Sequence, residues 1–405
     1  MEKLYWLWLQ CALGQGNAAS DIIVKEQISP EMLYRSSEKE LLAQNILPQG
    51  LIKKLKRCPL DKAEKIYRQC QALKIWLMTP DDEDFPQRLR NIYQIPLVLY
   101  GVGSRSVLNR ELLLTMVGTR KATAIGCNSA TDLAQDLVQY GFGIVSGMAL
   151  GIDSCCHKGA LDMGGITIGV AGCGLDVNYP NGNVELRRAI ARKGAIISEY
   201  PPGVQAKPWN FPVRNRIVSG LSLGTVVVEA SAKSGTLITA ELALQQGRDV
   251  FALPTDLYNN RGEGNLNLIG QGATIVFSAE SIAEEYSALY GDKMSKTIES
   301  RMRLRRQGHA ESFTIPPQKE EMLPLQTPVE KPAVKKEVRT PVQEALPEGL
   351  DPTSQAVLRC ISERPLRVEE ISLICGIDMQ ETLAILSELE IDGHAKAYPG
   401  KQFGR

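Results

Sequence analysis

The sequence predicts an α/β protein built on a Rossmann-like, doubly wound and mostly parallel sheet. In the middle of the chain, short apolar runs alternate with amphipathic stretches of helical period. Continuous apolar runs suit strands that are buried on both faces, and their alternation with helices is typical of parallel βαβ units. The runs are LLLTMV, GIVSGMA, ITIGVAG, AIISEY, TVVVEA, DVFALP and ATIVFS.

Composition divides the 405 residues into four parts, a number of domains that this length allows. Residues 1–78 carry helix-start signals and amphipathic stretches, which predict a small helical domain. Residues 79–292 contain the predicted sheet. Residues 293–348 are rich in Pro, Lys and Glu and are expected to form a flexible linker. Residues 349–405 form a separate compact tail.

The tail has the outline of a winged-helix domain. A first helix over DPTSQAVLRCISER precedes a helix-turn-helix pattern that breaks at Gly376, and a short wing surrounds Pro399-Gly400. The candidate recognition helix, DMQETLAILSELEIDG, is acidic. We therefore expect a protein contact or a weak DNA contact here rather than strong reading of the major groove.

Charge and cysteine usage exclude several classes of protein. The formal net charge is +0, so any anion site must be built locally and not by a general cationic field. Nine cysteines without a CxxC motif and only three histidines favour reduced thiols and no metal site. No apolar run reaches membrane-spanning length, and the N-terminus lacks the features of a signal peptide. These features predict a cytoplasmic protein without a membrane contact.

Glycine-rich polar turns follow the predicted strands, at the sheet edge where ligands of open α/β folds bind. Glycine lets backbone N–H groups approach a phosphate, and helix N-termini and hydroxyls favour anions. None of the turns has the spacing of a dinucleotide-binding motif or a P-loop, so neither NAD nor ATP is indicated and no cofactor is expected. A polyanion such as a nucleic-acid backbone is the leading interpretation. The turns contain Gly118-Thr119-Arg120, Ser146-Gly147, Gly172 with Gly174, and Lys233-Ser234-Gly235-Thr236.

The string FPVRNR is expected at the same edge, ahead of a helical stretch RIVSGLS. Its arginines can fork two phosphate oxygens or stack on a base. Phe211 and Trp209 offer aromatic faces for bases. The competing interpretation is that Arg214 or Arg216 pairs inside the protein with Glu199 or Glu229, which end nearby strands. The sequence leaves open which arginine faces a ligand.

Taken in order, these motifs resemble the DprA/Smf family of DNA-processing proteins. The resemblance covers roughly residues 80–285, and its most specific motifs run from ISEYPPG to FALP. It also implies the flanking parts, because many members carry an N-terminal domain of SAM or helix-hairpin-helix type and a C-terminal winged helix.

The resemblance implies a protein without catalysis that binds and protects incoming single-stranded DNA in natural transformation. It further implies a homodimer that helps to load the RecA recombinase. Carried over by motif, the strand would lie on Gly118, Thr119, Arg120, Ser146, Gly147, Lys207, Phe211, Arg214, Asn215, Arg216, Lys233, Ser234, Gly235 and Thr236.

Three positions depart from the family pattern. Leu150 replaces the usual Arg or Lys of the second turn, which removes one cation from the expected DNA path. Thr255 stands where a Gly is common and Leu266 where an Asn is usual, so the local turn geometry there is in question.

Two enzymatic alternatives remain. Related Rossmann-like phosphoribohydrolases carry a G-G-x-G-T-x-x-E signature, but here Thr239 replaces the glutamate, which removes the carboxylate their chemistry needs. Ser146, Asp153 and His157 also spell a Ser/Asp/His set, although Asp153 is better explained as a helix cap and Ser146 as an anion-binding hydroxyl.

Overall fold

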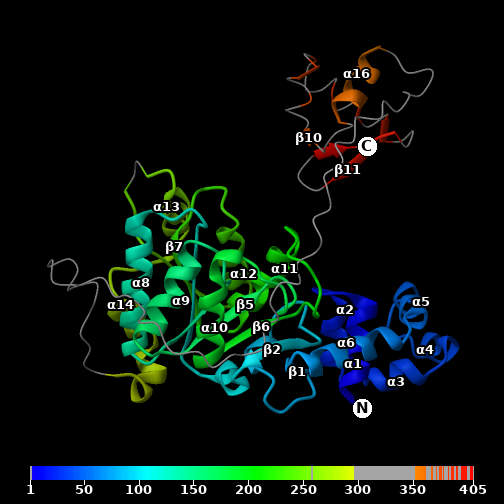
Figure 1. Cartoon of the computed structure of the whole chain (residues 1–405), viewed down its shortest axis with the longest axis horizontal. Coiled ribbons are helices and arrows are strands. Elements are labelled where there is room, and N and C mark those ends of the chain that lie inside the picture. Colours follow the sequence, from blue (N-terminus) through cyan, green and yellow to red (C-terminus); the bar gives the residue numbers. More distant parts are fainter. Residues whose placement is uncertain are drawn as a thin grey trace, which may run out of the picture. The chain divides into compact units, whose positions relative to one another are not determined.

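The computed structural model describes residues 2–256, 259–295 and 352–361, and parts of residues 366–404. The chain divides into two compact units, residues 1–327 and 328–405. Figure 1 shows the elements of both units.

The first unit is built on a nine-stranded sheet in the order β1-β2-β6-β5-β4-β3-β7-β8-β9. Every pair from β6 to β9 is parallel, whereas β2 is antiparallel to both of its neighbours. The predicted mostly parallel, doubly wound sheet is confirmed, and each of the predicted apolar runs overlaps one strand. The strands are β1 (Trp76–Met78), β2 (Leu99–Gly103), β3 (Leu113–Gly118), β4 (Gly143–Ser146), β5 (Thr167–Ala171), β6 (Ala195–Ser198), β7 (Gly224–Glu229), β8 (Asp249–Ala252) and β9 (Thr274–Ile275).

Helices cover both faces of the sheet (Figure 1). The strands carry apolar side chains on both faces, as β3 illustrates. Leu114 and Met116 belong to the apolar core on one face of the sheet, and Leu113 and Val117 belong to the core on the other face. The first core includes side chains from α8 (Ala124–Gln139), α9 (Ile152–Asp162) and α14 (Ala279–Tyr290). The opposite core includes side chains from α7 (Gln87–Arg90), α11 (Asn210–Gly220), α12 (Thr236–Gln245) and α13 (Glu263–Gly270). Helix α10 (Val184–Lys193) packs beside α9.

The N-terminal helices share an apolar core with the edge of the sheet. Gln10 lies at this junction, where its amide donates hydrogen bonds to the carbonyl oxygens of Val98 and Glu199. The Tyr100 hydroxyl donates to Gln10 Oε1 over 2.7 Å. Buried polar groups that are paired in this way fix the register between packed elements. The helices are α1 (Glu2–Leu13), α2 (Ala19–Lys25), α3 (Pro30–Arg35), α4 (Glu38–Gln44), α5 (Gln49–Arg57) and α6 (Asp61–Ala72).

The second unit contains helix α16 (Pro352–Cys360) and a three-stranded sheet in the order β10-β12-β11. The antiparallel pair β11 (Lys396–Tyr398) and β12 (Gln402–Gly404) forms the predicted wing, and β10 (Leu366–Arg367) completes the sheet. The predicted break at Gly376 and much of the candidate recognition helix lie outside the described residues. The predicted linker, residues 293–348, also lies almost wholly outside them.

Within the parts of the chain that the structure describes, no helix is both long and apolar enough to cross a bilayer. All nine cysteines are free thiols.

We expect His157 on α9 to make the stability of the fold depend on pH. Its ring is fully buried, Nδ1 lies 2.7 Å from Thr167 Oγ1, and Nε2 has no partner. Burial, together with the smaller effect of the Arg214 charge, lowers the pKa of His157 to about 3. In the unfolded chain histidine titrates near pH 6.5. As the pH falls below about 6.5, the unfolded state therefore binds a proton at His157 that the folded state does not bind, and this favours unfolding.

The free energy of unfolding is therefore expected to fall by about 2 kcal/mol between about pH 7 and about pH 5. Denaturant titrations at the two pH values measure this. The variant His157→Gln retains a hydrogen-bonding group toward Thr167 but cannot titrate. Its free energy of unfolding should therefore lack this decrease between the two pH values. Equal pH dependence in both proteins would show that His157 is not the responsible group.

Candidate nucleic-acid interface

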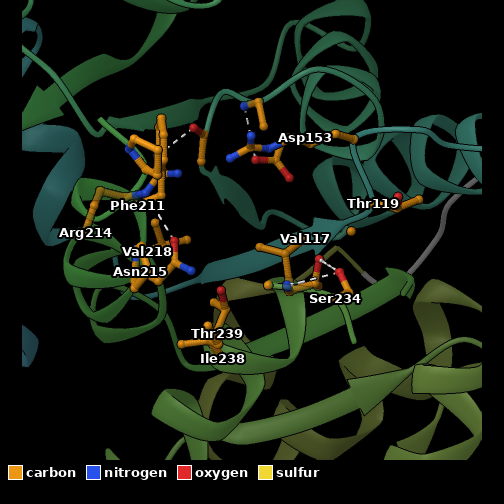
Figure 2. A pocket seen from close by; sticks show the side chains of 18 of the residues that line it. Val117, Thr119, Asp153, Phe211, Arg214, Asn215, Val218, Ser234, Ile238 and Thr239 are labelled. Carbon is orange, nitrogen blue, oxygen red and sulfur yellow. Dashed lines mark hydrogen bonds between the residues drawn. The ribbon is translucent and has the colours of Figure 1, made fainter. Parts of the chain in front are cut away.

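A cavity of about 630 Å³ opens where the strand order of the sheet reverses. From β3 the chain proceeds to β4, β5 and β6 on one side, whereas β7, β8 and β9 lie on the other. Ligands of open α/β sheets bind at such a switch point, beyond the carboxyl ends of the strands. Figure 2 shows side chains from the start of α9, from α11 and from the start of α12 around this space.

The cavity brings together most of the predicted DNA-contact residues. They come from the turns after β3, β4 and β7 and from α11. The predicted residues that line it are Gly118, Thr119, Arg120, Gly147, Phe211, Arg214, Asn215, Ser234, Gly235 and Thr236.

Phe211 is the centre of a cluster of aromatic and cationic groups. The guanidinium carbon of the exposed Arg120 lies 4.9 Å from the Phe211 ring centroid, and that of Arg214 lies 5.7 Å away. The ring of Tyr179 is tilted against Phe211 with the centroids 5.4 Å apart. A Cβ on Gly172 would lie 2.9 Å from the Phe211 ring, so this glycine makes room for the aromatic side chain. Proteins that bind single-stranded nucleic acids combine aromatic rings, on which bases stack, with cationic side chains, which pair with phosphates.

Arg214 is a buried part of the cavity wall. Its Nη1 donates to the carbonyl oxygen of Gly147 over 2.6 Å and also to that of Val170. Burial lowers the pKa of Arg214, while the neighbouring charge of Asp153 opposes this shift. Burial raises the pKa of the Asp153 carboxyl, and Arg214 is the first of the groups that oppose it. The two charges therefore offset each other, and the exposed side chains of Arg120 and Lys121 supply the remaining positive charge of the lining.

Only glycine fits at position 147, because the side chains of Asp153 and Arg214 lie close to its backbone. A Cβ at this position would lie 2.8 Å from Asp153 Oδ2 and 2.9 Å from Arg214 Nη2. We expect Gly147→Ala to lower the stability by about 1–3 kcal/mol and to weaken ligand binding, because both neighbours must shift. Gly270→Ala is the control, since a Cβ there meets nothing within 4 Å. Unchanged unfolding and binding in Gly147→Ala would contradict this explanation.

Two hydroxyl groups line the cavity at the start of α12, one just before the helix and one on its first residue. Ser234 Oγ lies 2.9 Å from Thr236 Oγ1 and accepts a hydrogen bond from the Thr236 amide. Thr239 follows on the first turns of α12 and also lines the cavity (Figure 2). The position of the missing glutamate therefore carries a hydroxyl and no carboxylate. This wall can donate hydrogen bonds to phosphate oxygens or base edges.

Four predicted contact residues are not among those that line the cavity. Ser146 is fully buried and donates to the carbonyl oxygen of Met116 over 2.7 Å, so its hydroxyl is not the free anion donor that the sequence suggested. Arg216 pairs internally with Glu199. Lys207 and Lys233 have exposed side chains outside the lining, and Lys207 Nζ lies 5.2 Å from the Trp209 ring centroid.

The internal pair that the sequence offered as an alternative is confirmed for Arg216. Its Nη2 lies 2.7 Å from Glu199 Oε1, and both side chains are buried. Its Nε donates to the carbonyl oxygen of Gln94 and its Nη1 to that of Val213. Arg216 therefore holds α11 against the end of β6 and against the segment that leads from the N-terminal helices.

Two local expectations are corrected. Helix α11 begins at Asn210, so FPVRNR forms its first turns instead of preceding it; Pro212 is tolerated there because the first turn has no amide partner to lose. Asp153 lies inside α9, whose N-cap is Gly151 with φ of +79°. The Ser/Asp/His alternative, which the sequence already disfavoured, lacks the geometry of a triad: His157 Nδ1 lies against Thr167 and Nε2 has no partner, so the imidazole bridges neither Ser146 nor Asp153.

Known proteins with similar sequences identify the family. The sequence profile described as DNA recombination-mediator protein A matches residues 76–287. The chain belongs to this family. A second profile, the DprA winged helix domain, matches residues 341–401 and confirms the predicted C-terminal domain.

Individual relatives of the DprA family agree with this assignment. The chain is 36% identical over 331 residues to Protein Smf of Synechocystis, which covers 81% of this chain and 79% of that protein. It is 42% identical over 203 residues to DNA processing protein DprA of Bacillus subtilis, covering 50% of this chain and 68% of that protein. The X-ray structure of DNA processing protein A from Streptococcus pneumoniae superposes with a TM-score of 0.60 at 32% identity, covering 69% of this chain and 97% of that one.

Sequence reasoning missed several residues that line the cavity of this DprA family member. Tyr179, Lys121 and Thr239 line it, and Asp153 lines it as a buried acid. Tyr179 lies in the string GLDVNYPNGN, which begins at Gly174 of the predicted glycine-rich turn, and this position is the signal that could have found it. DNA contact at any of these residues stays a prediction.

Proposed function

We propose that this DprA family protein binds single-stranded DNA in the cavity between α9, α11 and α12. The observation that supports this most is the Arg120–Phe211–Arg214 cluster, an aromatic face with cations at 4.9 and 5.7 Å from its centroid. The aromatic face suits unstacked bases, which duplex DNA does not present, while Arg120, Lys121 and the hydroxyls of Ser234 and Thr236 suit phosphates.

The proposal extends to the role that the family description names, mediation of recombination. In this role the protein protects incoming single strands during natural transformation in the cytoplasm, acts as a homodimer and helps to load the RecA recombinase. It does so without catalysis. Thr239 in the cavity wall supports this part, since a hydroxyl cannot replace a carboxylate as a general base or as a stabiliser of an oxocarbenium-like transition state. Release of ribose 5-phosphate from a nucleoside monophosphate would revive the phosphoribohydrolase alternative.

Binding should be selective for single strands and weaken with salt. In fluorescence anisotropy at matched ionic strength, oligothymidylate should bind more tightly than a duplex of equal length. The logarithm of the association constant should fall linearly with the logarithm of salt concentration, with a slope of about −0.7 for each phosphate neutralised. Equal affinity for single strands and duplex would count against the proposed site.

A further inference from the structure

The segment that joins β6 to α11 presents a second aromatic group beside the cavity. Ala206, Pro208 and Phe211 of this segment and of α11 line the cavity, but Trp209 does not. Trp209 is 65% exposed, although an indole of this size normally gains by burial. Lys207 Nζ lies 5.2 Å from its ring centroid. The two side chains therefore form an exposed pair next to the cavity mouth.

The other tryptophans of the chain show that this exposure is specific to Trp209. Trp6 and Trp8 are buried in the N-terminal core. Trp76 is half-buried, and its Nε1 donates to the carbonyl oxygen of Gly103 over 2.9 Å. Trp209 has its cation–aromatic contact with Lys207 and serves as the N-cap residue of α11 without a side-chain cap hydrogen bond. Neither the core nor the capping of α11 thus explains the indole at this position.

We propose that Trp209 and Lys207 form a second stacking station, which is a place outside the cavity where DNA is held. A base of the DNA strand that leaves the cavity stacks on the indole there, and Lys207 pairs with the adjoining phosphate. Both components are those of grooves that bind single strands without sequence preference. The station is continuous with the cavity through Pro208 and Ala206, which line it. This inference rests on the proposed function and extends the DNA path beyond the cavity.

The exposure of Trp209 also provides the measurement. Indole fluorescence should be quenched when a base stacks on Trp209, whereas the buried Trp6 and Trp8 should not respond. We would titrate the full-length protein with oligothymidylates of about 4 and about 20 nucleotides, which bracket the usual site sizes of single-strand binding domains. Quenching is expected with the long oligonucleotide and much less with the short one. It should disappear in Trp209→Phe and persist in the control Trp76→Phe.

Affinity gives an independent readout. Trp209→Ala should weaken binding of the long oligonucleotide by about 5-fold or more while changing binding of the short one little, because only the long one reaches the station. Lys207→Gln should reduce the magnitude of the salt slope for the long oligonucleotide by about 0.7. A destabilised protein would instead lose affinity for both lengths, and a thermal melt identifies that case.

The outcomes separate this inference from the proposed function. If wild-type protein binds the long oligonucleotide by anisotropy but Trp209 fluorescence does not change, the station is refuted and the cavity proposal stands. If neither oligonucleotide binds, the proposed function itself fails. Quenching that follows protein concentration without DNA would assign Trp209 to a contact between copies of the chain, and this would also overturn the station.

Discussion

Replacing Arg216 with methionine is expected to lower the free energy of unfolding by about 3–5 kcal/mol, because it leaves the carboxylate of Glu199 buried without its partner. Glu199 Oε2 already has no hydrogen-bond partner, and both side chains of the pair are 3–4% exposed. The change also removes donors to the carbonyl oxygens of Gln94 and Val213. Urea titration followed by circular dichroism measures the loss.

Two further variants show whether the buried charge is the cause. Arg188→Met breaks the exposed pair between Arg188 and Glu185, and it should cost at most about 1 kcal/mol, since exposed ion pairs contribute little. Adding Glu199→Gln to Arg216→Met should recover part of the lost stability, because the unpaired charge is then gone. If Arg216→Met unfolds at the wild-type midpoint yet no longer binds DNA, Arg216 would be a ligand contact and our assignment of it would be wrong.

Arg120→Ala and Phe211→Ala are each expected to weaken binding of single-stranded DNA by about 1–3 kcal/mol. Arg120 is exposed and lies over the Phe211 ring, so its removal should leave stability nearly unchanged while reducing the salt slope. Because the two side chains touch, their effects should not add in the double variant. Anisotropy with a labelled oligothymidylate measures all three proteins.

Arg192→Ala is the matched control for Arg120→Ala. Arg192 is also an exposed arginine, but it lies in the last turn of α10 and does not line the cavity. Its removal should leave affinity unchanged. If Arg120→Ala and Arg192→Ala weakened DNA binding equally, the affinity would depend on the overall charge of the protein and not on this site.

Much of the fold follows from local pattern. The strands β3 to β7 were predictable because each is buried on both faces and therefore reads as a continuous apolar run. Strands β8 and β9 each begin with an exposed residue, but the apolar runs around them still indicated strands. The edge strand β1 and its neighbour β2 were missed, because β1 has only three residues and β2 includes two glycines, which weaken any strand signal. Their place in the sheet depends on the pairing of β1 with β2 and the long-range pairing of β2 with β6, which no local window shows.

The candidate site was predictable in position but not in orientation. Turns after parallel strands must gather at one sheet edge, which placed Gly118, Gly147, Phe211 and Ser234 together. Whether a side chain points into the cavity or into the core depends on packing. Arg214 and Arg216 are two residues apart on one helix, and only the structure shows that one borders the cavity while the other pairs with Glu199.

Photo-cross-linking with an oligonucleotide that contains 5-iododeoxyuridine tests the central claim most directly. An iodinated base stacked on an aromatic ring cross-links to it on irradiation, and mass spectrometry of the digested complex locates the bond. Our account predicts cross-links at Phe211 or Tyr179, which should be lost in Phe211→Ala or when unlabelled oligothymidylate competes. Specific cross-links confined to other parts of the chain, with none at the residues that line the cavity, would contradict it.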